Sequence, residues 1–467
     1  MKLPVLQPKR VFEIFEEIAA IPHGSGNTEA ISQYCLAFAE KLGLDAQTDA
    51  LHNVVIRKAA SPGYEDHSPV LLQGHLDMVC ESERPFDFEM EGLSLHVEGD
   101  FLRADGTTLG GDDGIAVAMI LALLEDDSLA RPPIEALFTT DEETGMYGAV
   151  GLDPAMITAK QLINIDSEDE GVFTVGCAGG ARVEIDLPLV FEPIALPCYK
   201  ITVSGLIGGH SGNEIDKERL NANRVMGRIL SGIGPLQLIA FDGGGKDNAI
   251  PRSCVAVVAA QRDPNLRLPL VIGSVQSATD PDLTVTIEPT ETYGRACDKM
   301  STGIALSLLQ ALPNGIQQRC PDMPEMVQTS LNLGIAALRD GALHLSYLVR
   351  SSVNEEKARL LSRMERVAGE HGAVMTTHSH YPAWEYKKDS PLREKMIAAY
   401  RDLYDSDPQV VTIHAGLECG ILGSKIPGMD AVSIGPDLFD IHTSRERLSI
   451  SSTERVYRYL CHVLATL

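Results

Sequence analysis

A histidine and an aspartate stand two residues apart where an apolar segment ends, at His75 and Asp77. The residues before them, 71–74, predict a strand, and side chains two apart in an extended segment point the same way. A metal-bound imidazole usually needs its second ring nitrogen held by a carboxylate or a carbonyl, and Asp77 is spaced to do this. The same pair also fits a surface histidine beside a solvated aspartate, so this motif alone decides nothing.

The pattern of an acid after an apolar strand recurs along the chain, and a second histidine follows the last such strand. Open α/β sheets bind ligands at the carboxyl ends of their strands, so we expect these residues to meet at one sheet edge. The candidates are Asp112 ahead of an apolar helix at 115–124, Glu142 and Glu143 after a strand at 133–140, Asp166 after a strand at 161–165, and His442 after a strand at 431–435.

Imidazole and carboxylate groups with few nearby thiols suit a hydrolytic zinc, manganese or cobalt site. One catalytic ion needs about three protein ligands and a water, so a larger set favours two divalent ions that share a bridging carboxylate. Paired ions polarise a carbonyl and activate a water, which is the equipment for amide hydrolysis, and a further carboxylate beside them would act as general base. Glu142 and Glu143 are adjacent and chemically equal, so the residues alone do not say which is the ligand and which the base.

Several short motifs, in their order along the chain, resemble a family of dinuclear zinc peptidases that includes peptidase T, carboxypeptidase G and carnosinase. These motifs are His75-Leu76-Asp77, Gly111-Asp112-Asp113-Gly114, Asp141-Glu142-Glu143-Thr144-Gly145, Asn164-Ile165-Asp166-Ser167-Glu168 and Ile441-His442-Thr443. Further segments resemble the aminoacyl-histidine dipeptidase branch of that family, at 166–171, 208–212, 248–252 and 414–420. The resemblance spans nearly the whole chain.

The resemblance implies a role for each candidate at the sheet edge. The implied roles are Asp112 as the bridge between two zinc ions, His75 and Asp166 as the other ligands of one ion, Glu143 and His442 as those of the second, Glu142 as general base, and Asp77 as the residue that orients His75. The resemblance also implies a cis peptide between Asp112 and Asp113. The chain has Gly111 and Asp113 where that branch tends to carry alanine and asparagine, which adds negative charge near the ions.

The metal residues fall in two blocks, up to Asp166 and again near His442, so a domain inserted in the metal-binding one is the economical explanation. We predict an α/β fold in which a mixed-sheet, dinuclear metallopeptidase domain, residues 1–197 and 384–467, carries an inserted α+β lid domain, residues 198–383. Prolines at 193 and 197 and the segment 381–384 suggest the two boundaries.

The insert supplies candidates for substrate binding. The glycine-rich segment 208–212 is flexible enough to bring His210 onto a substrate carbonyl, and in the family such a histidine helps to stabilise the oxyanion, sometimes from a neighbouring subunit of a homodimer. Asn248 would donate a hydrogen bond to substrate, and Arg350 would form a bidentate pair with its carboxylate. Outside the insert, Glu418 would hold the substrate α-amine.

Composition excludes several classes of function. The chain has 467 residues, 44% of them hydrophobic, and a formal charge of −26, which disfavours nucleic acid and anionic membranes as partners. Its nine cysteines are scattered without a CxxC, which fits reduced thiols. We find no sustained apolar core in residues 1–5 and no stretch of about 20 apolar residues, so we expect a cytoplasmic protein.

These observations predict a cytosolic zinc-dependent dipeptidase that hydrolyses Xaa-His dipeptides, including the β-Ala-His type. Manganese and cobalt are alternatives to zinc. A tripeptidase or an N-acyl amino acid deacylase would share the metal residues, and a catalytically silent binding protein would share the scaffold. Because the HExxH, GxSxG, GxxxxGK[ST] and GxGxxG motifs are absent from the sequence, a zincin, a serine hydrolase and a nucleotide enzyme are disfavoured.

Overall fold

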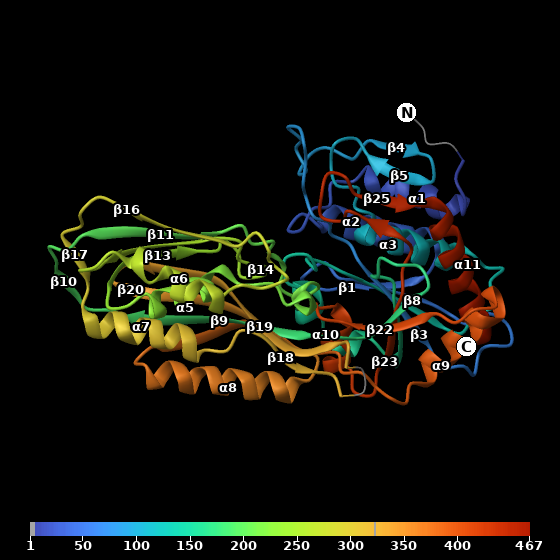
Figure 1. The fold of residues 1–467 in the computed structure, drawn as a ribbon. Helices are drawn as coiled ribbons and strands as arrows, with labels where there is room; N and C mark the ends of the chain where they lie inside the picture. The colour runs from blue at the N-terminus through green and yellow to red at the C-terminus, as the bar shows by residue number, and fades with distance from the viewer. Residues whose placement is uncertain (1–4, 322–323) are drawn as a thin grey trace. The chain divides into compact units, whose positions relative to one another are not determined.

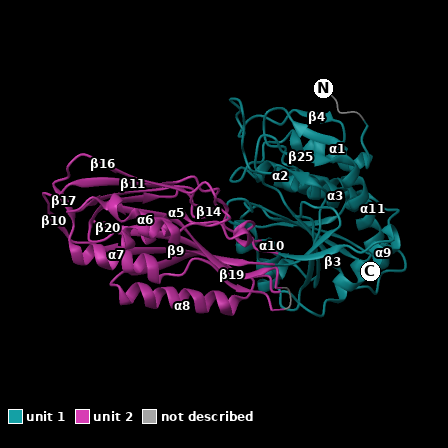
Figure 2. Ribbon diagram, viewed as in Figure 1, with its two compact units in different colours: residues 1–176, 386–412, 417–467 teal, residues 177–385, 413–416 magenta. Residues whose placement is uncertain are grey.

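The computed structural model describes residues 5–321 and 324–467, and the chain in it forms two compact units. Unit 1 comprises Met1–Gly176, Tyr386–Thr412 and Leu417–Leu467, and unit 2 comprises Cys177–Glu385 and Ile413–Gly416 (Figure 2). Residues 1–4, on which part of the expectation for the N-terminus rests, lie outside the described residues. Within the described part of the chain, no helix is both long enough and apolar enough to span a membrane.

Unit 1 is built on an eight-stranded mixed sheet (Figure 1). In spatial order its strands are β1 (Asp45–Thr48), β2 (Val54–Lys58), β6 (Ile134–Thr139), β3 (Val70–His75), β7 (Gln161–Asn164), β23 (Asp430–Ser433), β8 (Val172–Cys177) and β22 (Gln409–Ile413). The four central strands, from β6 to β23, run parallel. Every residue of β3 and β6 is buried, as expected for strands covered by helices on both faces.

Helices cover this sheet and complete its core. They are α1 (Lys9–Ala19), α2 (Glu29–Leu42), α3 (Gly111–Glu125), α4 (Tyr147–Gly151), α9 (Pro391–Tyr404), α10 (Glu418–Lys425) and α11 (Ile450–Thr466). The apolar run that predicts a helix at 115–124 lies in α3, which is buried on all sides and packs on α1 and β3. A smaller sheet of β4 (Leu95–Glu98), β5 (Phe101–Ala104), β25 (Arg447–Ser449) and β24 (Leu438–Phe439) belongs to the same unit.

Unit 2 has an antiparallel sheet with helices packed on it. Its strands are β16 (Thr284–Pro289), β11 (Cys198–Ser204), β15 (Cys254–Ala259), β13 (Gln237–Gly243), β19 (Val327–Arg339), β20 (Ala342–Ser351), β9 (Gly179–Pro188), β21 (Val374–Tyr381) and β18 (Gly315–Arg319). Along β9, buried Val183, Ile185 and Leu187 alternate with more exposed polar residues, so one face of the strand lies in the core. That core is closed by α5 (Ala222–Gly232), α7 (Lys299–Ala311) and α8 (Asn354–Glu370).

The predicted α/β fold with an inserted α+β region is therefore confirmed, but the first division of the chain lies earlier than the prolines suggest. β9 pairs with β20 and β21 over its length, so residues from Cys177 onward belong to unit 2. Pro193 ends β10 (Phe191–Pro193), and Pro197 precedes β11, so both prolines mark connections inside unit 2. Ala178 also donates its N–H to the carbonyls of Ile413 and Ala415, at 3.1 and 3.0 Å, which ties residues 413–416 to the same unit.

Candidate metal centre and substrate groups

Parallel strands bring several candidates to one edge of the unit 1 sheet. β3 pairs in parallel with β6 on one side and with β7 on the other, so the three strands end together. His75 is the last residue of β3, Glu142 and Glu143 lie in the loop after β6, and Asp166 follows the end of β7. The sheet topology thus places these four side chains at the edge where open α/β sheets bind ligands.

Asp112 and His442 come from outside the sheet. Asp112 lies in the first turn of α3, and its peptide bond to Asp113 is cis, as the family resemblance implies. His442 lies on the loop between β24 and β25, with a φ of 58° in the left-handed region. Asp112 places one oxygen against each histidine: Oδ1 is 3.1 Å from His75 Nε2, and Oδ2 is 3.2 Å from His442 Nε2.

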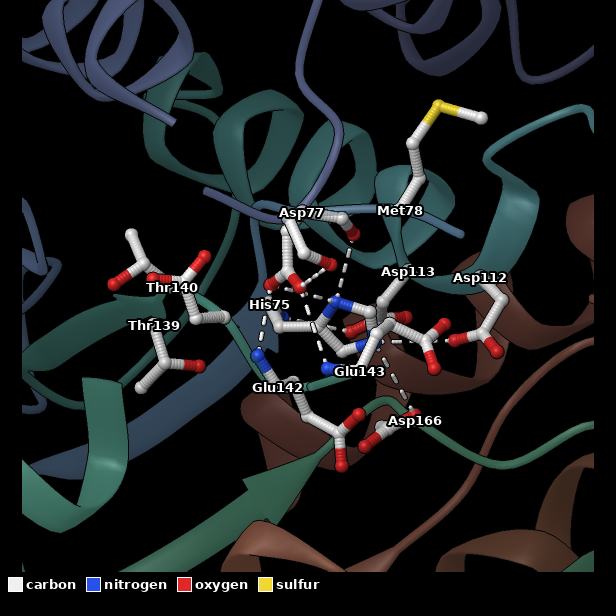
Figure 3. A network of polar contacts seen from close by, with 12 residues as sticks. His75, Asp77, Met78, Asp112, Asp113, Thr139, Thr140, Glu142, Glu143 and Asp166 are labelled. Atoms are coloured by element: carbon white, nitrogen blue, oxygen red, sulfur yellow. Dashed lines mark hydrogen bonds and ion pairs between the residues drawn. The ribbon is translucent and has the colours of Figure 1, made fainter. Parts of the chain in front are cut away.

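The side chains form overlapping groups whose potential ligand atoms lie within 4.8 Å of one another. His75, Asp112 and Asp166 form one group, and Asp112, Glu143 and His442 form another. His442 Nε2 is 3.0 Å from Glu143 Oε1, and His75 Nε2 is 3.9 Å from Asp166 Oδ1. A third group joins His75 to Glu142 and Glu143. Figure 3 shows these acids converging on the His75 imidazole.

The pKa values of the side chains in this cluster reflect their burial and the short distances between their charges. Burial raises the pKa of Asp166 and of Glu142 well above their ordinary values. Burial also acts on Asp112, but the hydrogen bonds from His442 and His75 outweigh it and lower the pKa of that carboxyl. Against the effect of burial, the hydrogen bonds to Asp112 and Glu143 raise the pKa of His442 to about 11. Without an added cation, protons must therefore neutralise part of the cluster.

The donor set fits divalent metal ions. Asp166 Oδ2 is buried and accepts no hydrogen bond from the residues that the structure describes. Buried carboxylate oxygens without donors are costly unless they are paired or bind metal. Imidazole nitrogens and carboxylate oxygens are ligands of zinc, manganese and cobalt. Because Asp112 belongs to both histidine groups, it occupies the position of a bridge.

The Asp77 carboxylate contacts more than His75. The His75 Nδ1 lies 2.9 Å from the backbone carbonyl of Asp77 but 3.6 Å from the nearer carboxylate oxygen. That carboxylate accepts the backbone N–H groups of Glu142 and Glu143, at 3.0 and 3.3 Å, and the hydroxyl of Ser25, at 2.7 Å. Asp77 therefore orients His75 through its backbone and the glutamate loop through its side chain. Ser25 is not among the predicted site residues, because nothing local in the sequence links residue 25 to residue 77.

Asp113, the residue after Asp112, is a buried acid. Its side chain is 2% exposed, and its Oδ2 accepts the backbone N–H of His75 at 3.1 Å. Burial raises the pKa of Asp113 well above its ordinary value. Burial at this position therefore disfavours the negative charge that the sequence suggests.

Glu418 lies inside unit 1. Its side chain is fully buried, and one carboxyl oxygen accepts hydrogen bonds from Gln73 Nε2 and Thr139 Oγ1, both at 2.6 Å. Gln73 is also bonded to Asn164, at 2.6 Å, so a buried polar chain crosses β6, β3 and β7 just before the strands end. These contacts hold one oxygen of Glu418 against the strand ends, the other oxygen has no partner among the described residues, and the expectation that Glu418 holds a substrate amine stays a prediction.

Unit 2 brings His210 and Asn248 together on adjacent short strands. His210 pairs with Ala249 between β12 (Gly209–His210) and β14 (Ala249–Ile250), and the Asn248 carbonyl accepts the N–H of Ser211 at 2.9 Å. His210 Nδ1 accepts the N–H groups of Gly212 and Asn213, at 3.3 and 3.1 Å. These contacts favour the tautomer that carries its proton on Nε2.

Arg350 and His414 lie beside the same loop. A Cβ on Gly212 would lie 3.0 Å from His210 Cε1, 3.2 Å from Arg350 Nε and 2.7 Å from the His414 carbonyl. Arg350 is 6% exposed and donates to Tyr381 Oη at 3.0 Å, while its Nε has no acceptor among the described residues. His414 Nε2 is 2.7 Å from Ser330 Oγ. His414 is not among the predicted site residues, because only the return of residues 413–416 to unit 2 brings it here.

Comparisons with known proteins agree over the length of the chain. Residues 71–466 match the description "Peptidase family M20/M25/M40". The chain is 34% identical over 477 residues to the cytosol non-specific dipeptidase of Escherichia coli (strain K12), covering 99% of this chain and 98% of that protein. A crystal structure of aminoacylhistidine dipeptidase from Vibrio alginolyticus is similar with a TM-score of 0.91 at 32% identity, covering 98% of this chain and 96% of that one. Aminopeptidase PepT from Bacillus cereus ATCC 10987 shares the fold, with a TM-score of 0.59 at 15% identity and 99% of each chain covered.

Proposed function

The chain belongs to peptidase family M20/M25/M40, and from that premise we propose that it is a metal-dependent dipeptidase acting on dipeptides with a C-terminal histidine. The relatives from Escherichia coli and Vibrio alginolyticus are both named dipeptidases, and the second is named for aminoacyl-histidine substrates. The observation that carries the proposal is Asp112, whose two oxygens each face one histidine of the cluster. Small peptides are its substrates. We propose that it acts in the cytoplasm, the compartment named for the Escherichia coli relative. We also propose that it is a homodimer.

We propose two divalent ions, zinc in the first place and manganese or cobalt as alternatives. His75, Asp112 and Asp166 would hold one ion, and Asp112, Glu143 and His442 the other. When bound, such a pair supplies Lewis acidity toward the peptide carbonyl and lowers the pKa of a water molecule.

Glu142 is the proposed general base. It would take a proton from the attacking water and deliver it to the leaving amine nitrogen. Burial raises the pKa of the Glu142 carboxyl, so it holds a transferred proton more readily than an exposed glutamate does. Asp77 accepts the backbone N–H of both Glu142 and Glu143, which favours a fixed separation between the base and the neighbouring ligand.

The substrate groups of unit 2 suit the non-reacting parts of a dipeptide. Arg350 would pair with the substrate carboxylate, since its buried guanidinium still has an N–H without an acceptor among the described residues. His210, with its proton on Nε2, would donate to the carbonyl oxygen as negative charge develops there. Asn248, next to His210 in space, would add a second donor.

The test is hydrolysis of Ala-His, β-Ala-His, Ala-Ala and Ala-Ala-His by chelated protein before and after zinc or manganese is restored. We expect metal-dependent release of histidine from the dipeptides and little cleavage of the tripeptide. Equal cleavage of Ala-Ala would support a dipeptidase of broad specificity and reject histidine selection. Preference for the tripeptide would reject the dipeptidase assignment, and absence of turnover with either metal would favour a silent binding protein.

A further inference from the structure

Glu446 makes an unusual set of hydrogen bonds for a buried carboxylate. Its side chain is 3% exposed. One oxygen accepts the backbone N–H groups of Leu109 and Gly110, at 2.7 and 3.1 Å, and the other accepts those of Gly111 and Asp112, at 2.8 and 3.2 Å. No lysine or arginine forms an ion pair with it in the described part of the chain, and the donors to its two oxygens are consecutive backbone N–H groups.

The turn that receives Glu446 is shaped for this contact. Gly110 has a φ of 65°, in the left-handed region that favours glycine. A Cβ on Gly111 would lie 3.1 Å from Glu446 Oε1 and 2.8 Å from Leu438 Cδ2, so a side chain there would crowd both neighbours. The carboxylate therefore fixes the backbone of the turn that ends at Asp112.

The other end of Glu446 belongs to the loop that carries His442. β24 and β25 pair through Leu438 with Leu448, and the loop between them ends at Glu446. The Glu446 N–H donates to the Thr443 carbonyl at 3.1 Å, next to His442 in the chain. One side chain thus joins the His442 loop to the turn that presents Asp112.

We propose that Glu446 is a positioning residue that sets the separation of Asp112 and His442, and thereby the affinity of the metal position that these two share with Glu143. The inference rests on the metal centre of the proposed function. His75 and Asp166 are positioned by β3 and β7, and among the described residues the hydrogen bonds of the Glu446 side chain go to the turn at 109–112, so we expect the other metal position to depend on it mainly through Asp112. The effect of losing Glu446 should therefore be unequal between the two ions.

Glu446→Gln tests this with little change in volume. The variant keeps one oxygen acceptor but turns an NH2 group toward two backbone N–H donors. Zinc binding is measured by equilibrium dialysis, the melting temperature on chelated protein, and kcat and KM on Ala-His. We expect one zinc to lose about 10–100-fold in affinity, the other to change by less than about threefold, and kcat to fall by about 10–100-fold with KM nearly constant.

Two further variants separate positioning from folding. Glu446→Asp keeps the carboxylate on a shorter side chain and should recover part of the zinc affinity and of kcat; it also carries the test if Glu446→Gln does not fold. Glu83→Gln makes the same substitution at an exposed glutamate that accepts from Ser444 Oγ of the same loop at 2.9 Å, and should match the wild type.

Equal weakening of both zinc ions, or wild-type affinity for both with only a lower melting temperature, would overturn the proposal. A wild-type protein that binds two zinc ions but hydrolyses no dipeptide would defeat the proposed function instead, and the dialysis would still decide the role of Glu446.

Discussion

The candidate sites in the two units bury opposite charges. In unit 1, the carboxylates of Asp112, Glu143 and Asp166 gather around two histidines, and no lysine or arginine pairs with them among the residues described. In unit 2, the buried guanidinium of Arg350 contacts the Tyr381 hydroxyl and forms no ion pair with a described residue. Buried charges are costly unless they are paired. Unit 1 is therefore prepared for cations and unit 2 for an anion.

The neighbours of each cluster reinforce this difference. Burial and the charge of Arg350 lower the pKa of His414 to about 3, so the imidazole beside the arginine is neutral and adds no positive charge. In unit 1, by contrast, acidic neighbours raise the pKa of His442 to about 11 against the effect of burial. The same residue type thus takes opposite states in the two units, as expected if one binds metal ions and the other a substrate carboxylate.

Asp112→Asn is expected to have the largest effect, because it removes the residue shared by both metal groups. We expect loss of both ions and a fall in turnover of at least about 10³-fold, since the activation of both water and carbonyl goes with the ions. Asp113→Asn is the matched control: a neutral amide can still accept the His75 N–H, so metal content and turnover should stay near the wild type. Retention of two ions by Asp112→Asn, measured by elemental analysis, would contradict the cation-binding role of unit 1.

Glu142→Gln tests whether Glu142 transfers protons without being a ligand of the metal ions in unit 1. We expect kcat to fall by about 10²–10⁴-fold, the usual contribution of a general base, while metal content and KM stay close to the wild type. Asp141→Asn, at the adjacent acid that accepts the Gly26 N–H at 2.6 Å, should have a much smaller effect. A Glu142→Gln variant that loses metal instead would make Glu142 a ligand and reopen the choice between Glu142 and Glu143.

The sequence predicts the elements of unit 1 better than the extent of unit 2. Apolar segments at 133–140, 161–165 and 115–124 correspond to β6, β7 and α3, because buried strands and helices carry their signal locally. The boundary between the two units near Gly176 has no such local signal in the sequence. β9 joins unit 2 by pairing with β20, far along the chain, and only the folded sheet shows that partner.

The residues of the candidate site also differ in how far the sequence reveals them. Family motifs name the side chains at the strand ends, and the structure brings those side chains together. The supporting contacts are not encoded in motifs: Ser25 reaches Asp77, and Glu446 reaches the turn at 109–112, through hydrogen bonds between common residue types. Glu418 lies in a motif, but only its full burial shows that its contacts are with strand ends.

Arg350→Ala tests whether the buried guanidinium in unit 2 pairs with the substrate carboxylate. We expect KM for Ala-His to rise by about 10–100-fold, since a charged hydrogen bond contributes about 1.5–3 kcal/mol, with metal content unchanged. The C-terminal amide of Ala-His should bind poorly to the wild type and suffer little further loss in Arg350→Ala. Arg339→Ala, at an exposed arginine on β19, is the control. An equal loss for both substrates in Arg350→Ala would mean that the arginine does not pair with the carboxylate.

Glu418→Gln is expected to have a smaller effect, on stability, and it tests whether ionised Glu418 destabilises the metal-free protein. Burial raises the pKa of Glu418 to about 7 from an ordinary value of 4.5. The stability that this group contributes is therefore fully present below 4.5 and is lost as the pH rises through about 7. A glutamine oxygen can still accept from Gln73 and Thr139, so the chelated variant should be more stable than the wild type by about 1–3 kcal/mol at about pH 8, measured by urea unfolding. Lower stability at that pH would show that the ionised carboxylate is needed.

Glu214→Gln in unit 2 should shift stability in the opposite direction. A hydrogen bond from Lys217, with the backbone N–H of His210 and the charge of Arg219, lowers the pKa of Glu214 to about 2. A depressed pKa means that the stability from this carboxylate is present above 4.5 and is lost as the pH falls toward 2. The same glutamate-to-glutamine change should therefore destabilise the protein slightly at about pH 8, where Glu418→Gln stabilises it. Shifts of the same sign in both variants would contradict the opposite effects of the two environments on these glutamates.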